Sequence, residues 1–246
     1  HELFSQSMVT LNTMICQRKY IYQLVDKLIV LSTTEEAFWN LFNINVQYLQ
    51  NPIDQFNSTY YSGDYILWIG RLEKKQKRYM DAIEIMKLVT EKFPDERMKI
   101  VGNEVTKGAL EEIKQKIHEY NLENNIEICG FQLDVSTYYQ NAKIHLVTSL
   151  YEAFPMTIIE SKSYGIPLVT YSMPYLELLR DYTESYISVE PKNIKMAAYE
   201  IIQLLNNKNK LLNMSYNAKE SIKSFYKTDL KKEWEKIFEE IIISDN

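Results

Sequence analysis

The stretch that indicates the fold most clearly is Ile144-His-Leu-Val-Thr148, followed by Ser-Leu-Tyr-Glu152-Ala-Phe-Pro-Met-Thr-Ile-Ile-Glu160 and then by Ser-Lys-Ser-Tyr-Gly165-Ile-Pro167-Leu-Val-Thr170. It predicts a strand, a turn through a proline, a helix and then a second strand. Two glutamates therefore bracket a loop and the first turn of a helix at the carboxyl end of a strand. In an open parallel sheet this edge binds ligands, and the unpaired amides of a helix start attract anions.

From residue 65 onward the chain repeats this alternation of apolar strands and amphipathic helices, which is typical of a doubly wound α/β domain with a parallel sheet. We expect strands over Tyr65–Ile69, Met98–Val101, Ile126–Cys129, Ile144–Thr148, Pro167–Thr170 and Tyr186–Val189. Apolar residues at helical spacing predict helices over Asp81–Lys92, Leu110–Tyr120, Val135–Asn141, Met196–Leu205 and Lys210–Phe225.

The two ends of the chain have a different organisation. Before residue 50 we expect helices over Ser5–Leu24 and Thr34–Phe42, each followed by a short strand, Lys27–Leu31 and Val46–Leu49. Asn51, Pro52 and the polar residues through Asp64 are typical of a linker between domains. A last helix is expected over Asp229–Ile243, with Trp234 on its apolar face.

Composition excludes several classes of protein. The formal net charge is -5 and no nucleic-acid-binding motif is present, which argues against a nucleic-acid binder. Cys16 and Cys129 lie far apart in apolar runs, so a disulfide scaffold and a thiolate metal site are both excluded, and a reducing cytoplasm fits best. The sequence shows no signal peptide and no apolar run of transmembrane length. Because the chain begins with a histidine and enters mid-pattern, we expect it to be a fragment of a longer protein.

Positive charge is concentrated in residues 71–78, a loop that leaves one expected strand and enters a helix. This basic loop holds five cations against the single acid Glu73: Arg71, Lys74, Lys75, Lys77 and Arg78. Positive charge is disfavoured at a helix N-terminus, so the cluster predicts an anionic partner. Arginine offers phosphate a flat two-pronged donor, and lysine offers a mobile point charge.

The segment from Glu152 to Pro167 resembles the E-x7-E signature of nucleotide-sugar glycosyltransferases of the GT-B fold, in particular their large retaining group called family 4. Two glutamates at this spacing are a weak signal alone. The combination of a strand, Glu, Phe-Pro-Met-Thr, Glu and Tyr-Gly-Ile-Pro is far more specific. The resemblance implies a Rossmann-like doubly wound parallel sheet, the GT-B C-terminal domain, beside a partial N-terminal Rossmann-like segment.

The resemblance also implies a division into domains. Residues 1–52 would be the remnant of an N-terminal acceptor-side domain, 53–64 a linker, and 65–228 the donor-binding domain for a nucleotide sugar. Residues 229–246 would form a helix that crosses back toward the N-terminal domain. A helix that caps its own domain is the alternative for this last segment.

The resemblance assigns roles to four charged residues. Arg71 and Lys77 would stabilise the charge that develops on the leaving diphosphate. Lys75 stays open as the phosphate lysine, because many family members carry it nearer the arginine. Glu152 would contact the transferred sugar. Glu160 would accept hydrogen bonds from the ribose hydroxyls, since a carboxylate can accept two at once.

Backbone positions would complete the donor site. Gly70, Gly102 and Gly130 follow or end three expected strands, where glycine permits a sharp exit and the close approach of a ligand. The remaining expected contacts, beside the base, the diphosphate or the sugar, are Phe131, Phe154, Pro155, Met156 and Thr157. Proline has no N–H, so position 155 cannot donate to a ligand.

Some residues near the site depart from the family or carry no expected role. Many members have glycine at the positions of Ala153 and Pro155, and a Gly-Gly turn where this chain has Ser172-Met-Pro174-Tyr175. Donor-sugar specificity therefore stays open. Tyr138 and Tyr139 are expected to pack in the interior without contacting a ligand.

The activity implied is transfer of a hexosyl or related sugar from a nucleoside-diphosphate sugar to an acceptor hydroxyl, with retention of configuration, in bacterial surface polysaccharide or glycoconjugate synthesis. The acceptor would be a glycan, a lipid-linked molecule or a protein. With no Asp-x-Asp motif, we expect no metal and no other cofactor. The protein would be cytoplasmic, and peripheral contact with the inner face of the membrane through the missing N-terminal domain stays open. This fragment alone is expected to bind donor and transfer nothing.

Two other functions remain as alternatives. A catalytically silent GT-B subunit would support a partner glycosyltransferase or bind glycan, but it has no need to keep Arg71, a loop lysine, Glu152 and Glu160 together. A generic nucleotide-binding α/β module would carry a Walker loop or a Rossmann G-x-G-x-x-G, and the sequence has neither.

Overall fold

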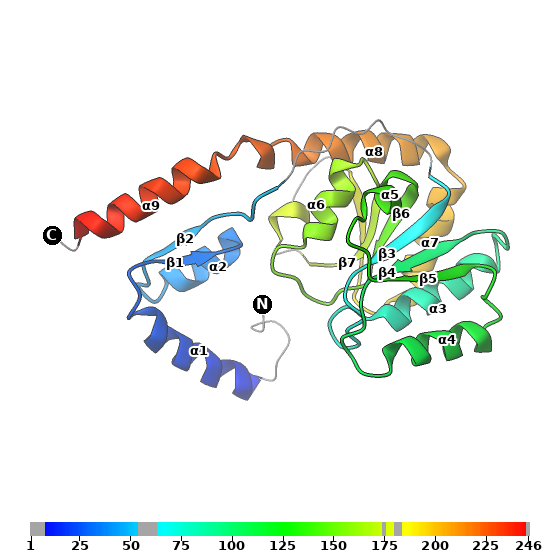
Figure 1. The fold of residues 1–246 in the computed structure, drawn as a ribbon, viewed down its shortest axis with the longest axis horizontal. Coiled ribbons are helices and arrows are strands. Elements are labelled where there is room, and N and C mark those ends of the chain that lie inside the picture. Colours follow the sequence, from blue (N-terminus) through cyan, green and yellow to red (C-terminus); the bar gives the residue numbers. More distant parts are fainter. Residues whose placement is uncertain (1–7, 54–62, 174–175, 180–183, 245–246) are drawn as a thin grey trace.

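The computed structural model describes residues 8–53, 63–173, 176–179 and 184–244. They form a large α/β domain around a six-stranded parallel sheet and a smaller N-terminal unit around a two-stranded sheet (Figure 1). The predicted fold class, a doubly wound parallel sheet, is confirmed. Most of the expected linker, residues 54–62, lies outside the described residues, as do Pro174 and Tyr175.

The large sheet has the strand order β5-β4-β3-β6-β7-β8, and every neighbouring pair is parallel. The strands are β3 (Tyr65–Ile69), β4 (Met98–Val101), β5 (Ile126–Gly130), β6 (Ala142–Val147), β7 (Leu168–Tyr171) and β8 (Tyr186–Val189). The chain runs outward from β3 to β5 and then returns to place β6 on the other side of β3. This reversal between β3 and β6 is a topological switch point, where α/β sheets bind their ligands.

Helices lie between these strands or after the last one, close to the predicted places. They are α3 (Tyr79–Thr90), α4 (Ala109–Glu119), α5 (Ser136–Gln140), α6 (Met156–Ser163), α7 (Ile194–Leu205) and α8 (Lys208–Ile222). The helix expected to run to Phe225 ends at Ile222, and a separate 3-10 turn covers Phe225–Lys227. The strand expected from Ile144 begins two residues earlier, because Ala142 already pairs with Tyr65.

Helices cover both faces of the sheet, so its strands are apolar along their whole length. On β3, Ile66 and Trp68 face the core beneath α3, α4 and α7, whereas Tyr65 and Leu67 face the opposite side with α5. A third cluster packs α6 and α8 against the β6–β7 end of the sheet. The rigid sheet therefore fixes the positions of the loops at its carboxyl edge.

The N-terminal unit contains α1 (Met8–Tyr22), β1 (Leu28–Val30), α2 (Thr33–Asn40) and β2 (Val46–Tyr48). Ser32 caps α2 by accepting a hydrogen bond from the amide of Glu35 at 3.1 Å, as serine commonly does at this position. Val30, Trp39 and Ile44 form a small core of its own. The unit therefore has a small hydrophobic core of its own and precedes the large domain in the sequence.

The final helix, α9 (Leu230–Ser244), extends away from the large domain and runs beside the N-terminal unit (Figure 1). Lys27 of that unit forms an ion pair with Glu240 of α9 at 2.5 Å. Trp234 lies on the apolar side of α9 with the buried Ile237, but Trp234 is 39% and Phe238 56% exposed, so this face is only partly covered. The two exposed rings stack on each other. None of the helices in the described ranges combines the length and apolar character that a membrane span requires.

Candidate functional site

Three glycines lie side by side at the carboxyl edge of β3, β4 and β5. The amide of Gly70 donates to the carbonyl of Val101 at 2.9 Å, and the amide of Gly102 donates to Gly130 at 2.8 Å. Gly102 has a φ of +149°, and a methyl group added there would stand 1.8 Å from the carbonyl oxygen of Gly70. Only glycine fits at position 102, because any side chain would force the two strand ends apart.

The basic loop, residues 71–78, is fastened to the loop that follows β6. Gln76 makes the connection twice: its carbonyl accepts from the amide of Leu150, and its side chain donates to the carbonyl of Tyr151, both at 2.9 Å. Thr148 adds a third tie, since its hydroxyl donates to the carbonyl of Lys77 at 2.7 Å and accepts from Trp68 Nε1 at 2.9 Å. The two loops that carry the predicted cations and glutamates therefore form one unit.

The cations of the basic loop are not all available to an external anion. Three form ion pairs with protein carboxylates: Lys74 with Glu112, Lys77 with Glu152, and Arg78 with Asp81. Carboxylates of the protein itself therefore pair with three of the five cations, and binding of an external anion by the loop stays a prediction. Arg71 is exposed and donates to Gln76 at 3.4 Å, and Lys75 is exposed; neither has a carboxylate partner among the described residues.

Arg78 and Asp81 have a structural role that the sequence did not reveal. Arg78 precedes α3 with a left-handed φ of 50°. Its guanidinium donates to both oxygens of Asp81 at 2.6 and 2.7 Å, and the hydroxyl of Tyr171 donates to the same carboxylate at 2.7 Å. This network fixes the start of α3, and thereby the end of the basic loop.

Lys77 and Glu152 join the two predicted clusters directly. Their side chains are only 12% and 9% exposed, so water screens the ion pair weakly. The Lys77 chain passes over Gly70, where an added methyl group would meet its Cδ and Cε at 3.7 Å. Of the two candidate lysines, the structure brings Lys77 to Glu152 and leaves Lys75 facing solvent. That Lys77 and not Lys75 binds phosphate stays a prediction.

Pro155 forms the N-cap of α6, with no side chain capping the helix. Its carbonyl accepts from the amides of Ile158 and Ile159 at 3.0 and 3.4 Å. The amides of Met156 and Thr157 have no protein acceptor within the part of the chain that the structure describes, as is usual for the first turn of a helix. These two N–H groups are therefore available to an anion.

Phe154 and Phe131, both predicted to line the site, have opposite environments. The Phe154 side chain is 6% exposed and packs near Phe225, with ring centroids 6.5 Å apart. It belongs to the hydrophobic core, so this position can reach a ligand only through its backbone. Phe131 follows Gly130, whose φ is +66°, and its ring is 65% exposed.

Glu160 lies on α6, one turn beyond the helix start, and is partly buried. Its Oε2 accepts a hydrogen bond from the hydroxyl of Tyr139 at 2.6 Å. Tyr139 is buried in the interior, as expected, and its hydroxyl makes this hydrogen bond in addition. No local signal could have found this contact, because it joins two helices whose residues are 21 positions apart.

His145 lies beneath the site, fully buried on β6, with its Nδ1 2.5 Å from the hydroxyl of Ser161. Burial and the positive charge of Lys77 lower the pKa of His145 to about 3. The imidazole is therefore neutral near pH 7 and supports the packing of β6 against α6.

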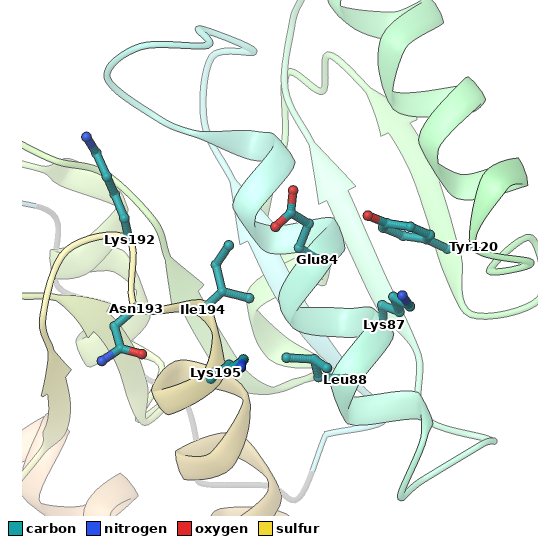
Figure 2. A pocket seen from close by; sticks show the side chains of 8 residues that line it. All are labelled: Glu84, Lys87, Leu88, Tyr120, Lys192, Asn193, Ile194 and Lys195. Atoms are coloured by element: carbon teal, nitrogen blue, oxygen red, sulfur yellow. The ribbon is translucent and has the colours of Figure 1, made fainter.

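A cavity of about 440 Å³ lies between α3 and the start of α7, with Tyr120 opposite (Figure 2). Its lining residues are Glu84, Lys87, Leu88, Tyr120, Lys192, Asn193, Ile194 and Lys195. None of them is a predicted site residue, so the candidate site is defined by its loops and helix start and not by this hollow. Searching the described residues for three or more clustered histidine, cysteine or acidic side chains finds no group that could hold a metal ion.

Three known proteins illustrate what this chain is similar to, two in sequence and one in structure. A protein of Haemophilus influenzae named as an uncharacterized glycosyltransferase is 25% identical over 219 residues, 86% of this chain and 61% of its own length. The amylovoran biosynthesis glycosyltransferase AmsD of Erwinia amylovora is 28% identical over 163 residues, 62% of this chain and 45% of its own. A mutant of S. aureus TarM, solved with Fondaparinux, alpha-GlcNAc-glycerol and UDP, superposes with a TM-score of 0.78 at 24% identity, over 91% of this chain and 46% of TarM.

This chain thus spans less than two thirds of the length of each of these proteins. The family model described as "Glycosyl transferases group 1" matches residues 51–221, which include the large sheet, the basic loop and both glutamates. The match covers well over half of the chain, and the parallel sheet agrees with the fold of TarM. The chain belongs to the group 1 family of glycosyl transferases.

Proposed function

We propose that this chain is the donor-binding part of a retaining glycosyltransferase, one that moves a hexosyl or related sugar from a nucleoside-diphosphate sugar to an acceptor hydroxyl. The observation that carries the proposal is the meeting of Lys77 and Glu152, 75 residues apart, at the switch point of the sheet. A cation that would bind the diphosphate and a carboxylate that would contact the sugar thus lie next to each other. The family to which the chain belongs supports the same activity.

The diphosphate would lie between the basic loop and the start of α6. Arg71 and Lys77 supply two cations from one side, and the amides of Met156 and Thr157 supply donors from the other. The positive end of the α6 dipole adds to their effect. UDP bound to TarM, which has the same fold, supports a nucleoside diphosphate as part of the ligand.

The nucleoside would extend from the diphosphate toward Glu160 and the strand ends. Glu160 would accept hydrogen bonds from the ribose hydroxyls. Gly102 lets the strand ends lie close together, and Gly130 has open space beside it, where the exposed ring of Phe131 can contact the base.

In the reaction, the bond between the sugar's anomeric carbon and the diphosphate oxygen breaks, and the acceptor oxygen bonds to the same carbon on the same face. The acceptor's hydroxyl proton passes to the leaving phosphate oxygen. Arg71 and Lys77 would stabilise the charge that gathers on the diphosphate as the bond breaks, in place of a metal ion. TarM was solved with UDP and the alpha-linked compound alpha-GlcNAc-glycerol, which supports retention when the donor is itself alpha-linked.

The proposal divides the chain as the resemblance does, with residues 65–228 binding the donor and 1–52 belonging to the acceptor side. The acceptor would be a glycan, a lipid-linked molecule or a protein used in surface polysaccharide or glycoconjugate synthesis, and the amylovoran enzyme AmsD supports this class. The reaction would take place in the cytoplasm, at the inner face of the membrane where the acceptor is lipid-linked.

Calorimetric titration with UDP, GDP and ADP tests the proposal. We expect one nucleotide to bind, and a double variant, Arg71→Ala with Glu160→Ala, to lose that binding. Lys77→Ala should weaken binding strongly, whereas Lys75→Ala, the matched control in the same loop, should have little effect. If well-folded wild-type protein binds none of the three nucleotides, this chain carries no donor site of its own and the silent-subunit alternative gains weight.

A further inference from the structure

Tyr139 is the residue near the site that the proposed function leaves without a role. Its side chain is 1% exposed, and its hydroxyl donates to Oε2 of Glu160 at 2.6 Å. A tyrosine that only filled the core would not need a hydrogen bond from its hydroxyl to Glu160, the carboxylate proposed to bind the nucleoside. The contact therefore calls for a functional explanation.

The ring of Tyr139 is held on two sides. It stacks on Tyr164 with centroids 5.5 Å apart and planes 14° apart, and it meets the edge of the buried His145 ring at 6.3 Å. Its amide donates to the carbonyl of Val135 at 3.2 Å. The hydroxyl cannot move without breaking this packing, so it marks a fixed point beside α6.

The hydroxyl is also a permanent donor. Burial, reinforced by the negative charge of Glu160, raises the pKa of Tyr139 well above its usual value. The phenol therefore keeps its proton under all ordinary conditions. A neutral hydroxyl that donates to a carboxylate forms a short, strong, charge-assisted hydrogen bond.

A fixed donor restricts Glu160, whose long side chain would otherwise sample several rotamers. Oε2 is held by Tyr139, while Oε1 has no hydrogen-bond partner among the residues described. A carboxylate that recognises two neighbouring hydroxyls must present its oxygens in one orientation. The geometry of this contact supplies that orientation before any ligand arrives.

We infer that Tyr139 is a positioning residue, which holds the Glu160 carboxylate in the one orientation that accepts hydrogen bonds from the two ribose hydroxyls of the donor nucleotide. This inference rests on the proposed function, because it needs a nucleotide at Glu160. It assigns to the short helix α5 a part in recognition of the ribose.

The test compares UDP with 2′,3′-dideoxy-UDP, which lacks both ribose hydroxyls, by calorimetry. In Tyr139→Phe the ring and its stacking remain, so we expect the fold to persist, with circular dichroism and a thermal melt as checks. UDP affinity should fall about tenfold, as for the loss of one hydrogen bond to a charged group. Dideoxy-UDP affinity should stay unchanged. Tyr138→Phe, which removes the neighbouring hydroxyl on the same helix, should bind both nucleotides as the wild type does.

A double variant separates positioning from packing. Once Glu160→Gln has removed the carboxylate, adding Tyr139→Phe should weaken UDP binding by less than twofold, since the two residues act as a unit. Equal losses for UDP and dideoxy-UDP in Tyr139→Phe would overturn the inference, and so would no loss in a protein where Glu160→Gln does weaken UDP binding. Failure of the proposed function looks different: wild-type protein would bind no nucleotide, or Glu160→Gln would bind UDP unchanged.

Discussion

Replacing Glu152 with glutamine should tighten the binding of a nucleoside diphosphate, although Glu152 belongs to the proposed site. In the structure its carboxylate pairs with Lys77, the lysine proposed to bind the diphosphate. An incoming phosphate must share that ammonium group with Glu152 and is repelled by the carboxylate behind it. Glutamine keeps the size of the side chain and a hydrogen-bond acceptor but removes the charge.

The size of the effect follows from the burial of the pair. The two side chains are 12% and 9% exposed, so an effective dielectric constant of about 20 applies, as for pairs near a protein surface. With the ammonium between them, a phosphate charge and the carboxylate would be about 8 Å apart, which gives a repulsion of about 2 kcal/mol. This corresponds to about thirtyfold in affinity. Water that enters with the ligand reduces the repulsion, so we expect a gain of about 5- to 30-fold.

Calorimetry with UDP measures this gain, and Glu112→Gln is its control. Glu112 pairs with Lys74 in the same basic loop, so its replacement removes an equal charge from a lysine with no proposed role. UDP affinity in this control should change by less than about twofold. If Glu152→Gln weakens UDP binding as Arg71→Ala does, the carboxylate serves the nucleotide directly or holds Lys77 in place, and the reasoning is refuted.

Three further predictions concern stability. Gly102→Ala should lower the free energy of unfolding in urea by about 3 kcal/mol or more, because its methyl group would stand 1.8 Å from a carbonyl oxygen. The control Gly108→Ala, at positive φ but in open space, should lower it by about 1 kcal/mol. Equal losses in the two variants would contradict this prediction. Tyr171→Phe should cost about 1.5 to 3 kcal/mol in the same titration, since its hydroxyl donates to buried Asp81 at 2.7 Å, and an unchanged midpoint would speak against it. His145 has a pKa of about 3 in the folded protein, so below pH 6.5 it takes up a proton when the protein unfolds. Its contribution to the free energy of unfolding is therefore complete above pH 6.5 and is lost as the pH falls toward 3. The loss should approach about 1.4 kcal/mol per pH unit, and His145→Gln should flatten the slope between pH 6.5 and 5 if the histidine is its source.

The strands could be predicted from the sequence because helices cover both faces of the sheet, which makes each strand an uninterrupted apolar run. Tyr65–Ile69, Met98–Val101 and Tyr186–Val189 match β3, β4 and β8 residue for residue. Helix ends were less accurate, because caps depend on single backbone angles and side-chain contacts. α3 begins two residues before the predicted Asp81, since Arg78 adopts a left-handed conformation and pairs with that aspartate.

Strand order explains why the candidate site could be foreseen in outline: parallel strands bring their carboxyl ends, and the loops after them, to one edge. The partners of individual side chains could not be foreseen. Lys77 and Glu152 are 75 residues apart, and Tyr139 and Glu160 are 21 apart, so each contact depends on how separate elements pack. The roles of these residues toward a ligand stay predictions.

The ion pairs within the basic loop bear on how salt would act on the proposed ligand. Three of the five cations already have carboxylates as neighbours, so the field outside the loop is weaker than the sequence suggests. Long-range attraction, which ionic strength screens strongly, would contribute little to binding. Affinity would depend instead on donors aimed at short range from the loop and from α6. A site of this kind would bind only an anion whose shape fits these donors. Other abundant polyanions of a cell would bind weakly despite their charge.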